Sequence, residues 1–176
     1  MYLVTPSGNS KNDITPDGLL TVGPDGEILR GPEGLRPSSE IWLHLVCYRE
    51  RKDVGGVVHA HPPAATGFAL DLPGKIEAVL IPCAIPLTEE APETVRPYLQ
   101  GYDAFLLANQ GALTVGSDVL AAHARMETLE HWARIRLIAR MLRGGEGSPP
   151  EQIGRLYAMW EGYGLAGERP GSPYRD

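Results

Sequence analysis

The sequence predicts an α/β protein whose central sheet is mainly antiparallel. Short extended segments separated by turns fill much of the chain, and one long amphipathic helical pattern comes late. The 176 residues include 21 glycines and 16 prolines, well above the roughly 12% that these two residues share in average proteins. This surplus predicts many turns and argues against a simple helix bundle. The length suits one domain with its own core.

Charge and composition narrow the class of partner. The formal net charge of −6 argues against a nucleic-acid partner, which would require a basic surface. No apolar run approaches the ~18 residues of a membrane span, and no signal peptide is readable after Met1. Cys47 and Cys83 lie far apart in apolar surroundings, as in a reduced cytoplasmic protein with free thiols. We therefore expect a cytoplasmic protein with no membrane partner.

The first third of the chain predicts strands and one helix. Strands are expected at Tyr2–Thr5 and Leu19–Val22, with a hairpin turn at Pro24–Gly26. A helix should begin at Ser38 or Ser39, either of which can cap it, and end near residues 51–52, where basic side chains suit a helix C-terminus.

The rest of the sequence, from Val54 on, predicts further strands and a long helix. Buried strands are expected at Val54–His61 and Ile76–Ile81, each ended by proline. A hairpin should join Ala104–Leu107 to Ala112–Val115 through residues 109–111. A helix is expected over Val119–Arg143, and a short one from residue 150 to about 160. The long helix should bury one apolar face, made mostly of Val119, Met126, Leu129, Ala133, Leu137 and Met141.

The strongest local motif is His59-Ala60-His61. Residues i and i+2 of a strand point to the same face, so the two imidazoles can reach one metal ion. Such a pair needs further ligands. The alternative is two unrelated histidines at a strand end, each with its own hydrogen bond.

Glu40 is one candidate for a further ligand, because it follows Ser38 and Ser39 at the expected helix start. The serine hydroxyls and the helix amides there would suit a phosphate, although ordinary helix capping explains the same residues. His44 lies one helical turn after Glu40, where a core histidine is favoured over a partner of the metal site.

A third cluster consists of His123, Glu127 and His131, with Glu130 beside them. The i, i+4, i+8 spacing aligns the three on one helix face and would allow metal chelation. It fits better with a solvated polar face opposite the apolar one.

Four segments, taken in order, resemble the class II aldolase/adducin family, and within it the L-fuculose-1-phosphate aldolase type. They are Leu3–Gly8, Pro37–Glu40, Asp53–Pro62 and Leu106–Leu113, and the resemblance extends from residue 1 to about residue 140. It implies a three-layer α/β/α fold over residues 1–165, followed by a flexible tail at 166–176. It also implies a homotetramer with one Zn²⁺ per subunit.

The resemblance also implies roles for particular residues. Zn²⁺ would be held by Glu40, His59 and His61, and Glu40 would double as the catalytic acid/base. The catalytic proton donor would be Tyr163. The phosphate of a sugar phosphate would be bound by four residues: Ser7, Gly8, Ser38 and Ser39. The implied reaction cleaves a phosphorylated ketose to dihydroxyacetone phosphate and an aldehyde, through a metal-stabilised enediolate.

Two departures from the family pattern keep other functions open. Gln110 stands where the family has a third histidine ligand, and an amide oxygen is a poor zinc ligand. The family's N-terminal helix and Gly-Asn turn also have no counterpart in this sequence. One alternative is a non-catalytic, adducin-like assembly module with a decayed metal site. Another is an epimerase, dehydratase or decarboxylase acting on a related sugar phosphate.

Overall fold

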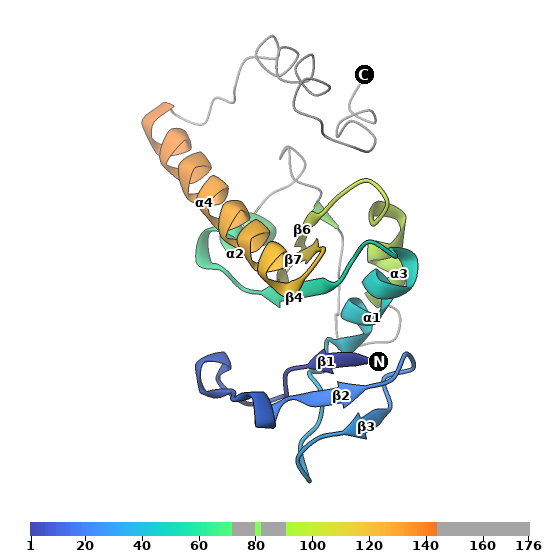
Figure 1. Cartoon of the computed structure of the whole chain (residues 1–176). Helices are drawn as coiled ribbons and strands as arrows, with labels where there is room; N and C mark the ends of the chain where they lie inside the picture. The colour runs from blue at the N-terminus through green and yellow to red at the C-terminus, as the bar shows by residue number, and fades with distance from the viewer. Residues whose placement is uncertain (72–79, 82–90, 144–176) are drawn as a thin grey trace.

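The structure is a computed structural model that describes residues 1–71, 80–81 and 91–143. Its centre is a four-stranded sheet in the order β4-β7-β6-β5 (Figure 1). The β4-β7 and β6-β7 pairs are antiparallel and the β5-β6 pair is parallel, which confirms the mainly antiparallel sheet. The strands are β4 (Gly56–Ala60), β5 (Leu80–Ile81), β6 (Ala104–Leu107) and β7 (Gly111–Gly116).

Helices cover both faces of this sheet, which confirms the three-layer α/β/α fold. Helices α2 (Pro63–Asp71) and α4 (Val119–Arg143) lie on one face, whereas α1 (Ile41–Glu50) and α3 (Ala91–Val95) lie on the other. Alternate side chains of β6 pack against the two helical layers: Phe105 packs with α1, and Leu106 packs with α2 and α4. Successive side chains of a strand point to opposite faces of the sheet, so neighbouring residues of β6 pack in different layers.

A second, three-stranded antiparallel sheet lies below α1 (Figure 1). Val22 packs there against Ile41 and Leu45 of α1, so α1 is shared by both sheets. The strands are β1 (Tyr2–Val4), β2 (Leu20–Val22) and β3 (Ile28–Arg30). The short 3-10 turns among the described residues are Lys11–Asp13, Pro16–Gly18 and Arg96–Tyr98.

Several elements differ from the sequence expectation. The bounds of β6 and α4 agree, but α1 begins at Ile41 and its N-cap residue is Glu40, so the serine caps were wrong. The Oγ of Ser38 instead accepts the Glu40 N–H at 3.4 Å, within a turn that precedes the helix. Helices α2 and α3 were not expected. Pro63 at the first position of α2 was the available signal, because proline suits that position.

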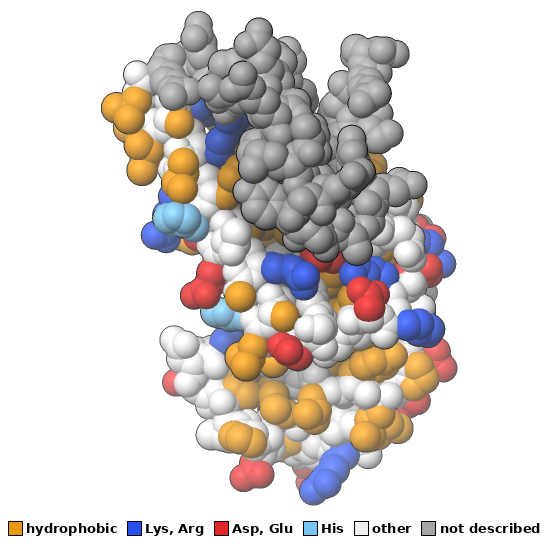
Figure 2. Space-filling model, turned by 45° about the horizontal axis from the view of Figure 1, so that its top comes forward, with side chains coloured by type: hydrophobic (Ala, Val, Ile, Leu, Met, Phe, Trp, Pro, Cys, Tyr) orange, Lys and Arg blue, Asp and Glu red, His pale blue; other side chains and the backbone are white. Residues whose placement is uncertain are grey.

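The expected apolar face of α4 is only half correct. Met126, Leu129 and Ala133 are buried, whereas the other three expected members (Val119, Leu137 and Met141) are exposed. Helix α4 runs well past the edge of the sheet, so its apolar periodicity continues where no described element packs against it (Figure 1). Figure 2 shows apolar side chains gathered over this outer end.

Some expectations lie outside the described residues. They are most of the strand at 76–81, the helix at about 150–160, the tail at 166–176, and residues Cys83 and Tyr163. Within the described part of the chain, no helix combines the length and the apolar character that crossing a membrane requires.

Arg51, which follows α1, connects the end of this helix to the segment before β6. Its guanidinium donates to Asp103 at 2.5 Å, to the backbone oxygens of Tyr102 and Leu99 at 3.1 and 3.3 Å, and to Asp53 through two bonds. The side chain is 16% exposed. One planar fork of donors therefore ties the end of α1 to the segment that precedes β6.

We expect Arg51→Lys to lower the free energy of unfolding by about 1–3 kcal/mol, because an ammonium cannot reproduce the fork and leaves partly buried acceptors unpaired. Urea denaturation measures this. The matched control is Arg49→Lys, since Arg49 forms an exposed pair with Asp25, and exposed pairs contribute roughly 0–1 kcal/mol. Equal effects of the two substitutions would contradict the assignment.

Candidate functional site

Glu40 and His59 meet between α1 and β4. The Oε2 of Glu40 lies against the Nε2 of His59, and the two side chains are 14% and 7% exposed. Beyond this contact, no hydrogen bond within the described residues satisfies Glu40 Oε2 or either ring nitrogen of His59. Buried polar atoms without partners are costly and uncommon, and an absent ion is one physical explanation.

The electrostatics of this pair favour an ionised carboxylate. Burial alone would raise the pKa of Glu40, but the hydrogen bond and charge of His59, with the nearby His61 and His44, outweigh burial and hold that pKa below its usual value. A carboxylate and an imidazole are both good ligands for a divalent metal.

His61 and Gln110 lie next to this pair. His61 falls just after β4, and its ring centre is 5.1 Å from that of His59. Gly111 has a positive φ of 75°, and a Cβ there would come within 2.4 Å of Ala60 O and 2.9 Å of the His61 ring. Only glycine allows the β6–β7 turn, which carries Gln110, to approach His61 so closely.

A carboxylate and two imidazoles suit a divalent metal chemically, and two of these three side chains already lie in contact. As the side chains stand, no group of three His, Cys, Asp or Glu in the part of the chain that the structure describes is close enough to hold an ion. Glu40 and His59 supply the converged donors, whereas His61 is beside them. His61 would have to reorient its ring to become the third ligand.

The predicted phosphate residues come from two segments that the fold brings together. The Ser7 N–H donates to Arg36 O at 2.8 Å, and the Ser38 N–H donates to Thr5 O at 3.3 Å. Pro6 and Pro37 form an isolated antiparallel bridge between them. The turn at Ser7 and Gly8 therefore lies beside Ser38 and Ser39, although 30 positions of sequence separate them.

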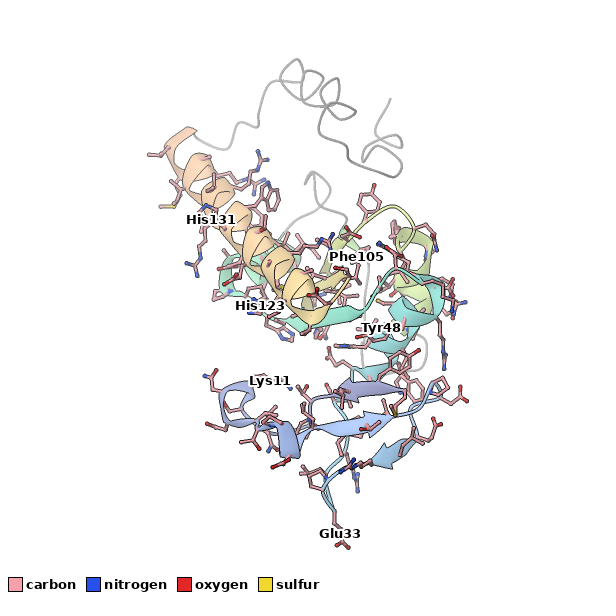
Figure 3. All side chains as sticks on the ribbon, viewed as in Figure 1. Lys11, Glu33, Tyr48, Phe105, His123 and His131 are labelled. Carbon is pink, nitrogen blue, oxygen red and sulfur yellow. The ribbon has the colours of Figure 1, made fainter. Side chains whose placement is uncertain are left out.

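Lys11 is a residue that the sequence reasoning missed. It lies on the turn after β1 (Figure 3), and its Nζ donates to the Thr5 Oγ1 at 2.9 Å. Its charge helps to lower the pKa of His44, so it lies within electrostatic range of that face of α1. A lysine three residues after Gly8 was the only available signal. It supplies a cation beside Thr5, whose backbone oxygen accepts the Ser38 N–H.

The side chains of His123, Glu127 and His131 on α4 are exposed to solvent. His123 Nδ1 lies 3.7 Å from Glu127, both side chains are exposed, and His131 is exposed as well (Figure 3). The favoured interpretation, a solvated polar face, is confirmed.

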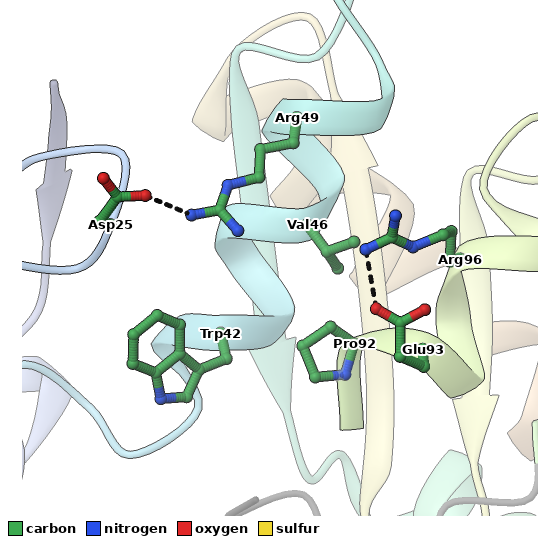
Figure 4. A pocket seen from close by; sticks show the side chains of 7 residues that line it. All are labelled: Asp25, Trp42, Val46, Arg49, Pro92, Glu93 and Arg96. Atoms are coloured by element: carbon green, nitrogen blue, oxygen red, sulfur yellow. Dashed lines mark hydrogen bonds and ion pairs between the residues drawn. The ribbon is translucent and has the colours of Figure 1, made fainter. Parts of the chain in front are cut away.

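A pocket of about 330 Å³ lies elsewhere, between α1, α3 and the β2–β3 turn (Figure 4). Helical spacing puts its residues Trp42, Val46 and Arg49 on the face of α1 opposite Glu40. Arg49 pairs with Asp25, and Arg96 pairs with Glu50 and Glu93. Both cations are already neutralised, so we assign the chemistry to the Glu40–His59 pair.

The fold and the paired segments define a three-layer α/β protein with the architecture of class II aldolases. A family model described as the class II aldolase and adducin N-terminal domain matches residues 1–137. The chain therefore belongs to this family, as the sequence motifs indicated.

Relatives within the family carry more than one activity. The chain is 30% identical to a 5-deoxy-D-ribulose 1-phosphate aldolase from Bacillus thuringiensis, covering 93% of this chain and 81% of that protein. It is 29% identical to an L-fuculose phosphate aldolase from Methanococcus maripaludis, covering 81% and 82%. It is also 30% identical to a 3-oxo-tetronate 4-phosphate decarboxylase from Escherichia coli, covering 82% and 76%.

Solved structures agree with the fold. An L-fuculose 1-phosphate aldolase superposes with a TM-score of 0.75 at 27% identity, covering 92% of this chain and 79% of that one. The L-fuculose-1-phosphate aldolase of Thermus thermophilus gives a TM-score of 0.68 at 32% identity, covering 84% and 82%.

His44 generates a prediction about acid stability. Burial, with a contribution from His59, lowers the pKa of His44 to about 4. In the unfolded chain this ring titrates near 6.5, so below that pH the unfolded state binds a proton that the folded state does not. The folded protein should lose roughly 1–3 kcal/mol from this residue as the pH falls from 6.5 to 4.

The measurement is the free energy of unfolding against pH for the wild type and His44→Asn. We expect the variant to gain relative to the wild type as the pH falls through this window. A difference between the two proteins that stays constant from pH 7 to pH 4 would refute the assignment.

Proposed function

We propose that this protein is a metal-dependent aldehyde-lyase that cleaves a ketose 1-phosphate to dihydroxyacetone phosphate and an aldehyde. The observation that carries the proposal is the buried, otherwise unsatisfied Glu40–His59 pair. The phosphate segments support it, because backbone bonds hold Ser7 beside Ser38 at the start of α1, which also carries Glu40. The aldolases among the relatives make a sugar phosphate the expected substrate.

We assign Glu40, His59 and His61 as ligands of Zn²⁺, one ion per subunit, with Gln110 as a weak fourth donor. When bound, such an ion supplies Lewis-acid stabilisation of negative charge on substrate oxygens. Apart from its contact with Glu40, the His59 ring makes no hydrogen bond within the described residues, so no other contact opposes its use as a ligand.

Side chains of the protein would carry out the proton transfers that accompany cleavage. Cleavage between C3 and C4 breaks that bond, leaves its electron pair on C3, and transfers the C4 hydroxyl proton to a base. We assign delivery of a proton to C3 to Glu40, whose carboxylate lies against His59. Because this carboxylate is ionised at rest, it first takes up a proton from solvent and then passes it to C3. We assign the proton transfer at the aldehyde oxygen to Tyr163.

Binding the phosphate would fix the reacting end of the substrate. We assign this role to Ser7, Gly8, Ser38 and Ser39, and add Lys11 as the nearby cation. Helix α1 begins without a side-chain cap, and a phosphate there would compete with the bonds that the Ile41 and Leu43 N–H groups donate to Ser38 O and Glu40 O. We further propose a cytoplasmic homotetramer.

A decarboxylase is a second candidate, because one relative that is 30% identical carries that name. Both reactions leave negative charge on a carbon beside a carbonyl, so the same site can serve either. The products distinguish them: dihydroxyacetone phosphate from 5-deoxy-D-ribulose 1-phosphate or L-fuculose 1-phosphate, and carbon dioxide from 3-oxo-tetronate 4-phosphate. A protein that converts none of these would support a non-catalytic assembly module instead.

Glu40→Gln tests the proton-transfer assignment. The amide keeps the shape of the carboxylate but cannot exchange a proton, so turnover of the best ketose 1-phosphate should fall about 10²–10⁴-fold. A coupled assay for dihydroxyacetone phosphate measures it. Glu50→Gln at the other end of α1 is the matched control and should retain turnover. Full activity in Glu40→Gln would exclude the assigned role.

Gln110→His tests the metal assignment. Imidazole is a better zinc ligand than an amide oxygen, so the substitution should raise zinc affinity and retention. Elemental mass spectrometry of zinc-loaded, dialysed protein measures the content per subunit. His59→Gln should retain little zinc in either background. Equal zinc content in all variants would show that the ion is held elsewhere.

A further inference from the structure

Glu130 connects α4 to the segment that carries the proposed metal ligands. Its Oε2 accepts the N–H groups of Ala64 at 3.0 Å and of Ala65 at 2.9 Å, and its Oε1 accepts the Arg134 Nε at 2.8 Å. The side chain is 13% exposed. The bonds to Ala64 and Ala65 join residues that are 66 and 65 positions apart in sequence, so they are tertiary contacts, whereas the Arg134 bond lies within α4.

The bonds complete the start of α2. A helix leaves its first N–H groups without partners inside the helix, and a preceding Ser, Thr, Asp or Asn commonly accepts them. Helix α2 begins at Pro63 and follows Pro62, and neither proline has a polar side chain. The carboxylate of Glu130 therefore does from α4 what a local cap residue does elsewhere, and its negative charge suits the positive end of the helix.

The start of α2 is continuous with the site. His61 is two residues before Pro63, between β4 and α2. On its other side, Gly111 of the β6–β7 turn approaches the His61 ring so closely that a Cβ would lie 2.9 Å from it. The β6–β7 turn thus limits the space for the His61 ring on one side. The backbone that follows His61 leads directly into α2, so its path depends on the position of the start of that helix.

We propose that Glu130 is a positioning residue that sets the orientation of His61 by fixing the N-terminus of α2. Its cation partner, Arg134, holds the carboxylate against the helix start. The inference rests in part on the proposed function, because it gives the orientation of His61 a purpose. It goes further by assigning a role to a residue outside the site.

The charge of Glu130 agrees with this geometry. Burial would raise its pKa, but the Ala65 N–H, Arg134 and the Ala64 N–H outweigh burial and lower that pKa below its usual value. The carboxylate is thus ionised at neutral pH, the form that accepts the amide hydrogens.

The test compares Glu130→Ala and Glu130→Gln with Glu127→Ala in the full-length chain. Glu127 is three residues earlier on the same helix, is 73% exposed and pairs only weakly with His123, so its removal controls for the loss of a glutamate from α4. Thermal unfolding first establishes a temperature at which every variant is folded. Glu130→Gln retains one acceptor oxygen and keeps the test possible if Glu130→Ala does not fold.

The first readout needs no metal. In the histidine ring ¹H–¹³C spectrum of metal-free protein, the His61 signals, assigned with His61→Gln, should shift in both Glu130 variants and stay in place in Glu127→Ala. Exchange protection of the Ala64 and Ala65 amides should fall in the same variants. His61 signals that do not move when this protection is lost would overturn the proposal.

The second readout is the dissociation constant of Zn²⁺, measured by competition with a chelator. It should rise about tenfold in Glu130→Ala, in the range typical of residues that orient metal ligands, and less in Glu130→Gln. Unchanged affinity in a protein that does bind zinc would refute the positioning role. If the wild type binds no zinc, the proposed function fails, and the ring spectrum alone decides the role of Glu130.

Discussion

The antiparallel pairing of β7 with both β4 and β6 is the constraint on which the rest of this structure depends. Every residue of β7 is buried, so the strand needs apolar layers on both faces, and the helices supply them. The same pairing sets His59 opposite Leu113 and Ala60 opposite Ala112. That register brings the end of β4 against the β6–β7 turn and makes a site possible there.

The candidate site is assembled from four separate parts of the chain. Glu40 comes from the start of α1, His59 from β4, Gln110 from the β6–β7 turn and Ser7 from the segment after β1. Each is held mainly by backbone contacts: strand register, the Pro6–Pro37 bridge and the close approach of Gly111. Among the described residues, Glu40 Oε2 and the ring nitrogens of His59 accordingly have no hydrogen-bond partner beyond their mutual contact, which leaves them available to a ligand.

Two charged side chains connect elements of the fold that are distant in sequence. Arg51 ties the end of α1 to the segment before β6, and Glu130 ties α4 to the start of α2. In both cases a charged group satisfies backbone atoms at an element end, where no local partner is available. Each contact fixes the relative position of two elements that are distant in sequence.

The sequence by itself determined the class of fold, the bounds of β6 and α4, and the family, because strand alternation, helical periodicity and the ordered motifs are local signals. It also brought Glu40, His59 and His61 forward as candidates. Tertiary structure alone decided which donors converge, that Lys11 contacts Thr5, that half of the α4 apolar face is exposed, and that α2 is capped by Glu130. These outcomes depend on contacts between residues far apart in the chain, which local patterns do not encode.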